Sequence, residues 1–270
     1  MRPSKDILTF GITFALILLV IVGFIGKSIF FQEKPIDQSQ QSATEDILKK
    51  YPSIPAEALR LKMSKNDPVE VIDIRPQPLY AQEHIPYSRN AIIGELDRYV
   101  PENKDALVIV LTLSDDVASI EQADAILKDK PFTYAFLDGG IASWKAVSGN
   151  LISIGDPDSV VDRSKVSFKT AEETNAILTG ADKNLYVIID TRSASAYSAG
   201  HIPTAINIPL DKLEQKRDSI PSGRQAIAYG SDDLESFQAA VRLYDLNVFS
   251  SSAIENGFAS WLEKKYEVAK

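Results

Sequence analysis

Cysteine is absent from the 270 residues, and histidine occurs only at His84 and His201. A chain without a thiol cannot form a disulfide, a thiolate metal site or a cysteine nucleophile. Basic residues number 29 and acidic residues 37, which gives a net charge of −8. A general nucleic-acid binder needs a basic face to neutralise phosphates, so this charge argues against nucleic acid as a partner.

Long hydrophobic runs are also scarce, and the main one lies near the N-terminus. The stretch Ile7–Gly26 contains no charged residue, and as a helix rising about 1.5 Å per residue it would span roughly 30 Å of hydrocarbon. A cleavable signal peptide, the alternative, has an apolar region of only about 7–15 residues and a small-residue cleavage site. The following Lys27–Phe31 offers no such site. We therefore predict a single transmembrane anchor, which makes the membrane a partner through Ile7–Gly26.

The charges around this run predict how the chain is oriented. Arg2, Lys5 and the α-amino group lie in residues 1–6, before the apolar stretch, and Lys27 and Lys34 follow it. Positive charge is therefore in slight excess on the N-terminal side. By the positive-inside rule, we expect a cytoplasmic N-terminus and extracytoplasmic folded domains in a single-pass membrane protein. Residues 27–52 are rich in glutamine and charge, so we expect a solvated tether.

The rest of the chain contains an internal repeat, in which each motif recurs 117 residues later. The repeated segments are Asp73-Ile74-Arg75 and Asp190-Thr191-Arg192, His84-Ile85-Pro86 and His201-Ile202-Pro203, Gly140–Trp144 and Gly257–Trp261, and Ser114–Asp116 and Ser231–Asp233. An ungapped match of this extent predicts two copies of one domain. We place domain 1 at 53–150, a linker at 151–165 and domain 2 at 166–270.

The sequence pattern of each copy predicts strands that alternate with helices. The expected strands are Val71–Ile74, Leu107–Leu111 and Tyr134–Leu137 in domain 1, and Tyr186–Asp190, Gln225–Tyr229 and Val248–Ser250 in domain 2. Helices are expected after Ser53-Ile54-Pro55, from Thr170, and over Ile120–Leu127 and Phe237–Leu243. Short apolar strands separated by helices are typical of an α/β domain whose parallel sheet is covered by helices on both faces.

These motifs resemble the rhodanese-like (sulfurtransferase) domain, present here in tandem. The resemblance rests on a strand that ends in D-x-R, the G-H-I-P-x-A-x-N-I-P segment at Gly200–Pro209, and G-[IF]-x-x-W near the end of each domain. The first copy departs from it, since Glu83 takes the place of the glycine and the last proline is missing. The resemblance covers about Ser53–Lys270 and implies the rhodanese-like fold for both domains.

The resemblance also implies where the chemistry of the family would be. In active members a cysteine ends the central strand and begins a C-x-x-G-x-R loop, whose backbone N–H groups hold the anionic substrate at a helix start. That position is Gly230 in domain 2, and the constant spacing places Leu113 there in domain 1. We regard both loops as degenerate active sites, formed by Leu113, Ser114, Asp115, Asp116, Val117 and Ala118, and by Gly230, Ser231, Asp232, Asp233, Leu234 and Glu235.

Two physical arguments then predict that sulfur transfer is lost, so no catalytic residue is assigned. Neither leucine nor glycine is a nucleophile, and no cysteine elsewhere can substitute. Each loop also carries paired aspartates, and like charges at about 4 Å cost on the order of 1–4 kcal/mol. We predict a pseudoenzyme that serves as a binding or scaffolding module for an unidentified protein partner. The alternative is a sulfurtransferase-related protein that binds or relays sulfur species.

Simpler roles remain for the polar residues. The Ser-Asp-Asp segments are interpreted as helix caps, although a weak calcium site stays open. A serine nucleophile at Ser114 or Ser231 is disfavoured because no histidine base is expected nearby. We predict neither a resident metal nor a cofactor. Structural roles are expected for Asp73, Arg75, His84, Asp190, Arg192 and His201.

Overall fold

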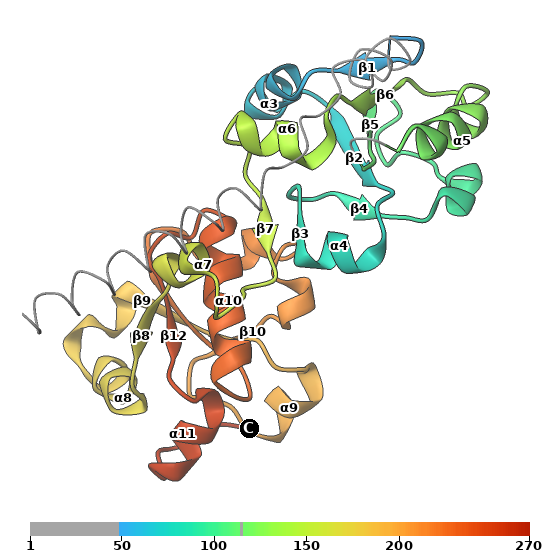
Figure 1. The fold of residues 1–270 in the computed structure, drawn as a ribbon. Helices are drawn as coiled ribbons and strands as arrows, with labels where there is room; N and C mark the ends of the chain where they lie inside the picture. The colour runs from blue at the N-terminus through green and yellow to red at the C-terminus, as the bar shows by residue number, and fades with distance from the viewer. Residues whose placement is uncertain (1–48, 114–115) are drawn as a thin grey trace, which may run out of the picture. The chain divides into compact units, whose positions relative to one another are not determined.

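Two five-stranded sheets organise the chain in the computed structural model, which describes residues 49–113 and 116–270 (Figure 1). The predicted anchor at Ile7–Gly26 lies outside these residues, as do Ser114 and Asp115. Among the helices that are described, none is both long and apolar enough to serve as a membrane span.

The first sheet has the strand order β1-β6-β5-β2-β4, and all neighbouring strands run parallel. Its strands are β1 (Ser53–Ile54), β2 (Val69–Asp73), β4 (Arg89–Asn90), β5 (Leu107–Leu111) and β6 (Tyr134–Leu137). The helices of this domain are α3 (Ala56–Ser64), α4 (Gln77–Gln82), the 3-10 helix η1 (Ile93–Arg98), α5 (Val117–Leu127) and α6 (Gly140–Ala146). Its core includes Val71, Ile109 and Leu111 from the two central strands.

The second sheet repeats this order as β8-β12-β11-β9-β10, again with parallel neighbours. Its strands are β8 (Ser167–Lys169), β9 (Tyr186–Asp190), β10 (Ile206–Asn207), β11 (Gln225–Tyr229) and β12 (Ser251–Ile254). The helices are α8 (Ala171–Thr179), α9 (Ala194–Ala199), α10 (Asp233–Asp245) and α11 (Gly257–Glu263), with 3-10 helices η2 (Ala181–Leu185), η3 (Leu210–Lys212) and η4 (Arg217–Ser219). The predicted α/β class and the two copies of a parallel-sheet domain are confirmed.

Local sequence explains where several helices begin. The predicted cap at Thr170 is present, since its hydroxyl accepts from the Glu173 amide while the Glu173 carboxylate accepts from the Thr170 amide. The helices predicted from Ile120 and Phe237 start earlier, at Val117 and Asp233, because aspartate caps precede them.

The predicted strand Val248–Ser250 is wrong, because the third central strand of domain 2 is β12, which begins at Ser251. Asn247 adopts a left-handed conformation (φ +64°) that ends α10, and the Val248 amide still donates to the Leu243 carbonyl. Val248 packs against the core from this turn. The strand itself starts with small residues, and the buried Ser251 hydroxyl donates to the Ala240 carbonyl of α10.

The linker at 151–165 contains two elements, β7 (Ile152–Ser153) and α7 (Val160–Lys165). Strand β7 pairs antiparallel with β3 (Glu83–His84) of domain 1, whereas the Ile152 side chain is fully buried in the core of domain 2. The Ser153 amide also donates to the Asp245 carboxylate at the end of α10. The linker is therefore packed against both domains.

Lys165 connects two carboxylates of this region, with 2.8 Å from its Nζ to Asp162 and 2.8 Å to Asp245. Burial raises the pKa of Asp245, and its hydrogen bonds do not compensate. Burial also opposes ionisation of Asp162, but hydrogen bonds from Lys165, the Asp156 amide and Ser153 outweigh it and lower the pKa of Asp162.

Candidate functional site

The D-x-R motif forms a buried ion pair at the end of β2 and of β9. In domain 1 the Arg75 Nη2 lies 2.6 Å from the Asp73 carboxylate, and it also donates to the Glu83 carbonyl at 2.8 Å. The pair Asp190–Arg192 has the same geometry, with 2.5 Å between the charged groups. Both pairs are almost fully buried. The expected pairing within each domain is confirmed, and these charges are satisfied by each other.

The two histidines share one local arrangement but differ in their outer contact. Each Nδ1 lies close to a backbone carbonyl four residues earlier, at 3.0 Å for His84 and 3.1 Å for His201. Each ring also stacks on the side chain of the residue that supplies this carbonyl, which is Tyr80 for His84 and Tyr197 for His201. The other ring nitrogen of His84, Nε2, lies 3.1 Å from a carboxylate oxygen of Glu214 in domain 2. The Tyr87 amide donates to the other oxygen of Glu214.

Strand register corrects the predicted equivalence of Leu113 and Gly230. The Ile74 amide donates to the Leu111 carbonyl, and the matching Thr191 amide donates to the Tyr229 carbonyl. Tyr229 therefore corresponds to Leu111, and the next residue, Gly230, corresponds to Thr112. The constant spacing of 117 fails here because β5 is displaced by one residue relative to β11.

The loop that follows is longer in domain 1, as the helix caps show. Asp116 caps α5 by accepting from the Ser119 amide at 3.0 Å, and Asp232 caps α10 by accepting from the Glu235 amide at 2.9 Å. Four residues, 112–115, separate Leu111 from its cap, whereas two residues, 230–231, separate strand and cap in domain 2. The predicted capping role of the aspartates is confirmed, and Ser119 corresponds to Glu235.

In domain 2 the loop amides are occupied by the protein's own side chains. The Ser231 amide donates to the Glu235 carboxylate at 2.7 Å, and the Gly230 amide donates to the Ser236 hydroxyl at 2.9 Å. The Ser236 hydroxyl donates in turn to the Asp232 carbonyl at 2.6 Å. A carboxylate thus binds a loop N–H that would otherwise be available to an anion at this helix start.

The Glu235 side chain also fills the space beside Gly230. A Cβ atom added at Gly230 would lie 2.4 Å from the Glu235 Cβ and 2.7 Å from its carboxyl carbon. The sequence predicts Glu235 only as part of the degenerate loop of domain 2, and this role was not predicted. The available signal was the spacing Asp232-x-x-Glu235, which resembles a capping box and predicts a side chain folded back over the loop.

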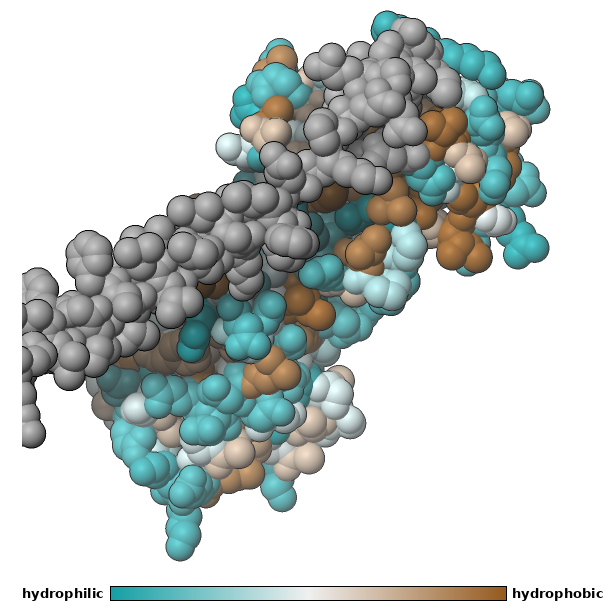
Figure 2. All heavy atoms as spheres, in the orientation of Figure 1, coloured by the Kyte–Doolittle hydropathy of each residue, from teal (hydrophilic) through white to brown (hydrophobic). Residues whose placement is uncertain are grey.

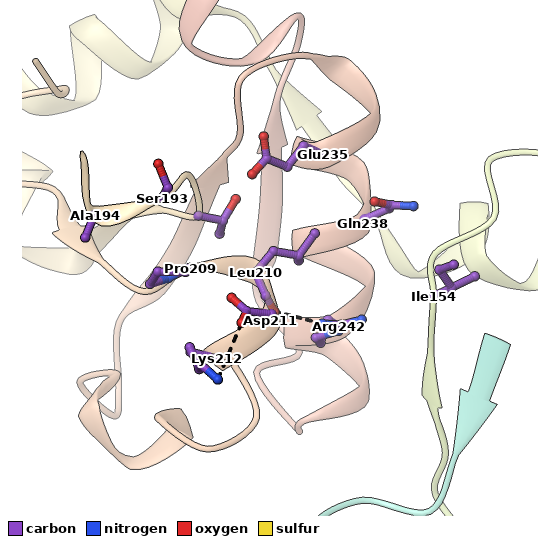
Figure 3. A pocket seen from close by; sticks show the side chains of 11 residues that line it. Ile154, Ser193, Ala194, Pro209, Leu210, Asp211, Lys212, Glu235, Gln238 and Arg242 are labelled. Atoms are coloured by element: carbon purple, nitrogen blue, oxygen red, sulfur yellow. Dashed lines mark hydrogen bonds and ion pairs between the residues drawn. The ribbon is translucent and has the colours of Figure 1, made fainter. Parts of the chain in front are cut away.

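A pocket of about 630 Å³ lies beside this loop in domain 2 (Figure 3). Figure 3 shows Glu235 and Arg242 on α10 beside the segment that contains Leu210, whereas Gln238 projects from the helix towards Ile154. The Arg242 Nη1 donates to the Leu210 carbonyl at 2.7 Å, and burial lowers the pKa of Arg242. The rest of the lining is Ile154, Thr191, Ser193, Ala194, Pro209, Asp211 and Lys212.

Domain 1 has a smaller pocket of about 290 Å³ in the matching place. Leu113 lines it, with 41% of its surface exposed, and Thr112 and Asp116 contribute the polar part. The Asp116 carboxylate is engaged by the amide and the hydroxyl of Ser119. Within the part of the chain that the structure describes, no group of three or more acidic or histidine residues is placed to hold a metal ion.

Comparison with known proteins gives one family. The model of the "Rhodanese-like domain" matches residues 55–147 and 170–264, which together cover more than half of the chain. The chain is similar to an uncharacterized protein of Bacillus subtilis (strain 168), YqhL, with 30% identity over 74 residues that cover 27% of this chain and 59% of that protein.

Among solved structures, the chain is similar to a thiosulfate sulfurtransferase from Pseudomonas aeruginosa, with 19% identity and a TM-score of 0.42. The match covers 81% of this chain and 43% of that chain. A rhodanese-like domain protein from Staphylococcus aureus shows 22% identity and a TM-score of 0.31, with 36% of this chain and 91% of that chain covered. The chain thus spans about half the length of YqhL and of the Pseudomonas protein.

Proposed function

Since the chain belongs to the rhodanese-like domain family and contains two copies of the fold, we propose that it is a pseudoenzyme that acts as a binding or scaffolding module. The chain is sulfurtransferase-related by its fold. Its sequence offers no thiol to carry the sulfane sulfur as a persulfide.

One observation carries this proposal: the Glu235 carboxylate binds the Ser231 amide and abuts Gly230. An active site of this family keeps its loop amides free for an anion, whereas here a fixed negative charge occupies one of them. An incoming thiosulfate would meet like charge, at a cost on the order of 1–4 kcal/mol at about 4 Å. The substitution of the cysteine and the filling of the loop oppose turnover in independent ways.

The test is thiosulfate:cyanide sulfur transfer by the full chain in detergent, measured beside an active sulfurtransferase. We expect thiocyanate to form no faster than in the buffer control. Turnover above that background would refute the proposal. An equal background for Gly230→Ala would show that residual signal does not come from this loop.

The second candidate function, passive binding of sulfur species, is favoured by the pocket of domain 2, because its lining includes the cations Arg242 and Lys212. Asp211 and Glu235 line the same pocket and oppose an anion. We expect thiosulfate and sulfite to leave the melting temperature of the full chain unchanged. A saturable rise with either anion, lost in Arg242→Gln, would support this second function instead.

We further propose that Ile7–Gly26 anchors the chain in a membrane and that residues 53–270 lie on the extracytoplasmic side. The support is the uncharged apolar stretch and the positive charge that precedes it. Protease added to intact cells or spheroplasts is expected to degrade the two domains. Protection of the domains, or their release by carbonate washing, would contradict this placement.

A further inference from the structure

The pocket of domain 1 differs in chemistry from its counterpart in domain 2. Strand register matches Ile74 with Thr191, and the residues two positions later are Pro76 and Ser193. Both positions line their pockets. At these two positions, hydroxyl groups in domain 2 are replaced by hydrocarbon in domain 1. The Glu235 carboxylate is also missing there, since its counterpart is Ser119.

Further apolar side chains lie around the opening of this pocket. Ile92 and Leu113 line it and remain 68% and 41% exposed, whereas Ile74 is only 9% exposed. Ile93 completes the apolar lining. In Figure 2 apolar residues of domain 1 gather on the side where Figure 1 draws α5 and the segment after β4. Large exposed aliphatic side chains around a cavity are typical of an interaction site.

The size of the pocket suits one side chain. Its volume of about 290 Å³ lies at the lower end of the range of roughly 300–1,000 Å³ that is usual for small-molecule sites. Protein interfaces, in contrast, often depend on a single anchoring side chain that fills a pocket of this kind. The pocket is therefore large enough to hold one aliphatic anchor.

The charges at this pocket define the surroundings of such an anchor. The cation of the lining, Arg75, is neutralised by Asp73, and no lysine is found among the described lining residues. Asp116 contributes a carboxylate to the wall. Glu95 adds a second one beside the rim, where its side chain accepts from the Ile92 amide at 3.3 Å. The rim is negative, as is the chain as a whole.

We propose that the pocket formed by Ile74, Pro76, Ile92, Ile93 and Leu113 binds one aliphatic side chain of a partner protein, in a segment with basic residues beside that side chain. The proposal rests on the proposed function as a binding module and assigns the contact to domain 1. Hydrocarbon lining favours the anchor, and the carboxylates of Asp116 and Glu95 favour its basic neighbours.

The test titrates three fluorescent peptides into the full chain in detergent and follows anisotropy. The probes are Arg-Arg-Leu-Arg-Arg, Arg-Arg-Ser-Arg-Arg and Glu-Glu-Leu-Glu-Glu. Burial of a leucine side chain predicts that the first binds roughly 10- to 100-fold more tightly than the second. The third, which is repelled by the rim, is expected to bind more weakly than the first.

Matched variants assign the contact to the pocket. Ile92→Ser should abolish most of the preference for leucine over serine, and it should leave the fold intact because Ile92 is largely exposed. Val100→Ser removes an equally exposed aliphatic chain that does not line the pocket, and Pro209→Ser changes the matching position of domain 2. Both should leave the preference unchanged.

Three outcomes would overturn the inference. These are equal affinity for the leucine and serine peptides, no response to Ile92→Ser, or an Ile92-dependent binding of phosphatidylcholine–phosphatidylglycerol vesicles in place of peptide. Sulfur transfer measured on the same samples separates this result from the proposed function. Turnover would refute the pseudoenzyme, whereas a failed titration without turnover would refute only the peptide site.

Discussion

Placing a cysteine at position 230, where the resemblance to the family puts it, tests whether Glu235 has closed the loop of domain 2. The added Cβ would lie 2.4 Å from the Glu235 Cβ, which is not the mobile end of that side chain. Overpacking of this kind costs about 1–3 kcal/mol. We expect Gly230→Cys to lower the free energy of unfolding by that amount. Glu235→Ala alone should cost about 1 kcal/mol, since it removes one hydrogen bond to the Ser231 amide.

The double variant separates the two effects. Alanine keeps the Glu235 Cβ but removes its Cγ and its carboxyl carbon, which would lie 2.5 and 2.7 Å from the added atom. If these atoms are the obstacle, Gly230→Cys/Glu235→Ala should be more stable than the sum of the single changes predicts, by about 1 kcal/mol. Urea unfolding of the full chain, followed by tryptophan fluorescence, measures this coupling. Thr112→Cys with Ser119→Ala is the matched cycle in domain 1, where no carboxylate occupies the corresponding place, and it should be additive within about 0.5 kcal/mol.

The same variants have a chemical readout. A carboxylate beside the new thiol disfavours the thiolate and repels thiosulfate, so Gly230→Cys should form no persulfide. In the double variant the thiolate should attack the sulfane sulfur of thiosulfate, whose S–S bond breaks with release of sulfite, so the chain should gain the mass of one sulfur atom. Additive stabilities together with equal persulfide formation in the single and double variants would refute the idea that Glu235 closes the site.

Three further predictions concern the supporting structure. Gly257→Ala should lower the free energy of unfolding in urea by about 2–5 kcal/mol, because the φ of Gly257 is +56° and the added Cβ would lie 2.6 Å from the Gly230 carbonyl oxygen. The control Gly223→Ala, where φ is +76° and no atom lies within 4 Å of the added Cβ, should lower it by only about 1 kcal/mol. Equal losses of stability in the two variants would contradict the contact at Gly257. A cycle of His84→Asn and Glu214→Gln should reveal a coupling of about 0.5–2 kcal/mol between the domains, and strict additivity would argue against it. The folded pKa of Asp162 is lowered, so the stability that its carboxylate contributes is present above its unfolded pKa near 3.9 and is lost as the pH falls through the folded value. The free energy of unfolding of Asp162→Asn should therefore depend less steeply on pH than that of the wild type below about pH 5. Parallel curves would refute the assignment.

Much of the fold was predictable because the repeated motifs mark positions with strong local requirements. The D-x-R ion pairs and the histidines stacked on tyrosine have the same geometry in both copies. The same is true of Trp144 and Trp261, because each indole N–H donates to a backbone carbonyl six residues later. Apolar strands such as β5 were visible because both faces of a central parallel strand are buried. These features depend on contacts within a short range of the chain or on burial alone.

The site was harder to predict because its geometry depends on register. Residue spacing cannot show that β5 is displaced by one position, since only the pairing with β2 determines it. The closure by Glu235 likewise depends on a side chain reaching back across a helix start. The strand β12 was misplaced because Val248 looks like a strand residue, whereas it packs from a turn and small serines form the strand.

The linker between the domains limits how this protein can be divided. Strand β7 completes a small sheet with domain 1, and the side chain of Ile152 in that strand belongs to the core of domain 2. Any cut before Ile152 takes a strand partner from the N-terminal half, and any cut after Ser153 leaves the C-terminal half with a hole where a buried isoleucine belonged. Neither half then keeps all of the contacts that it makes in the full chain, so a fragment that fails to bind or to fold would report on the missing segment as well as on the domain itself.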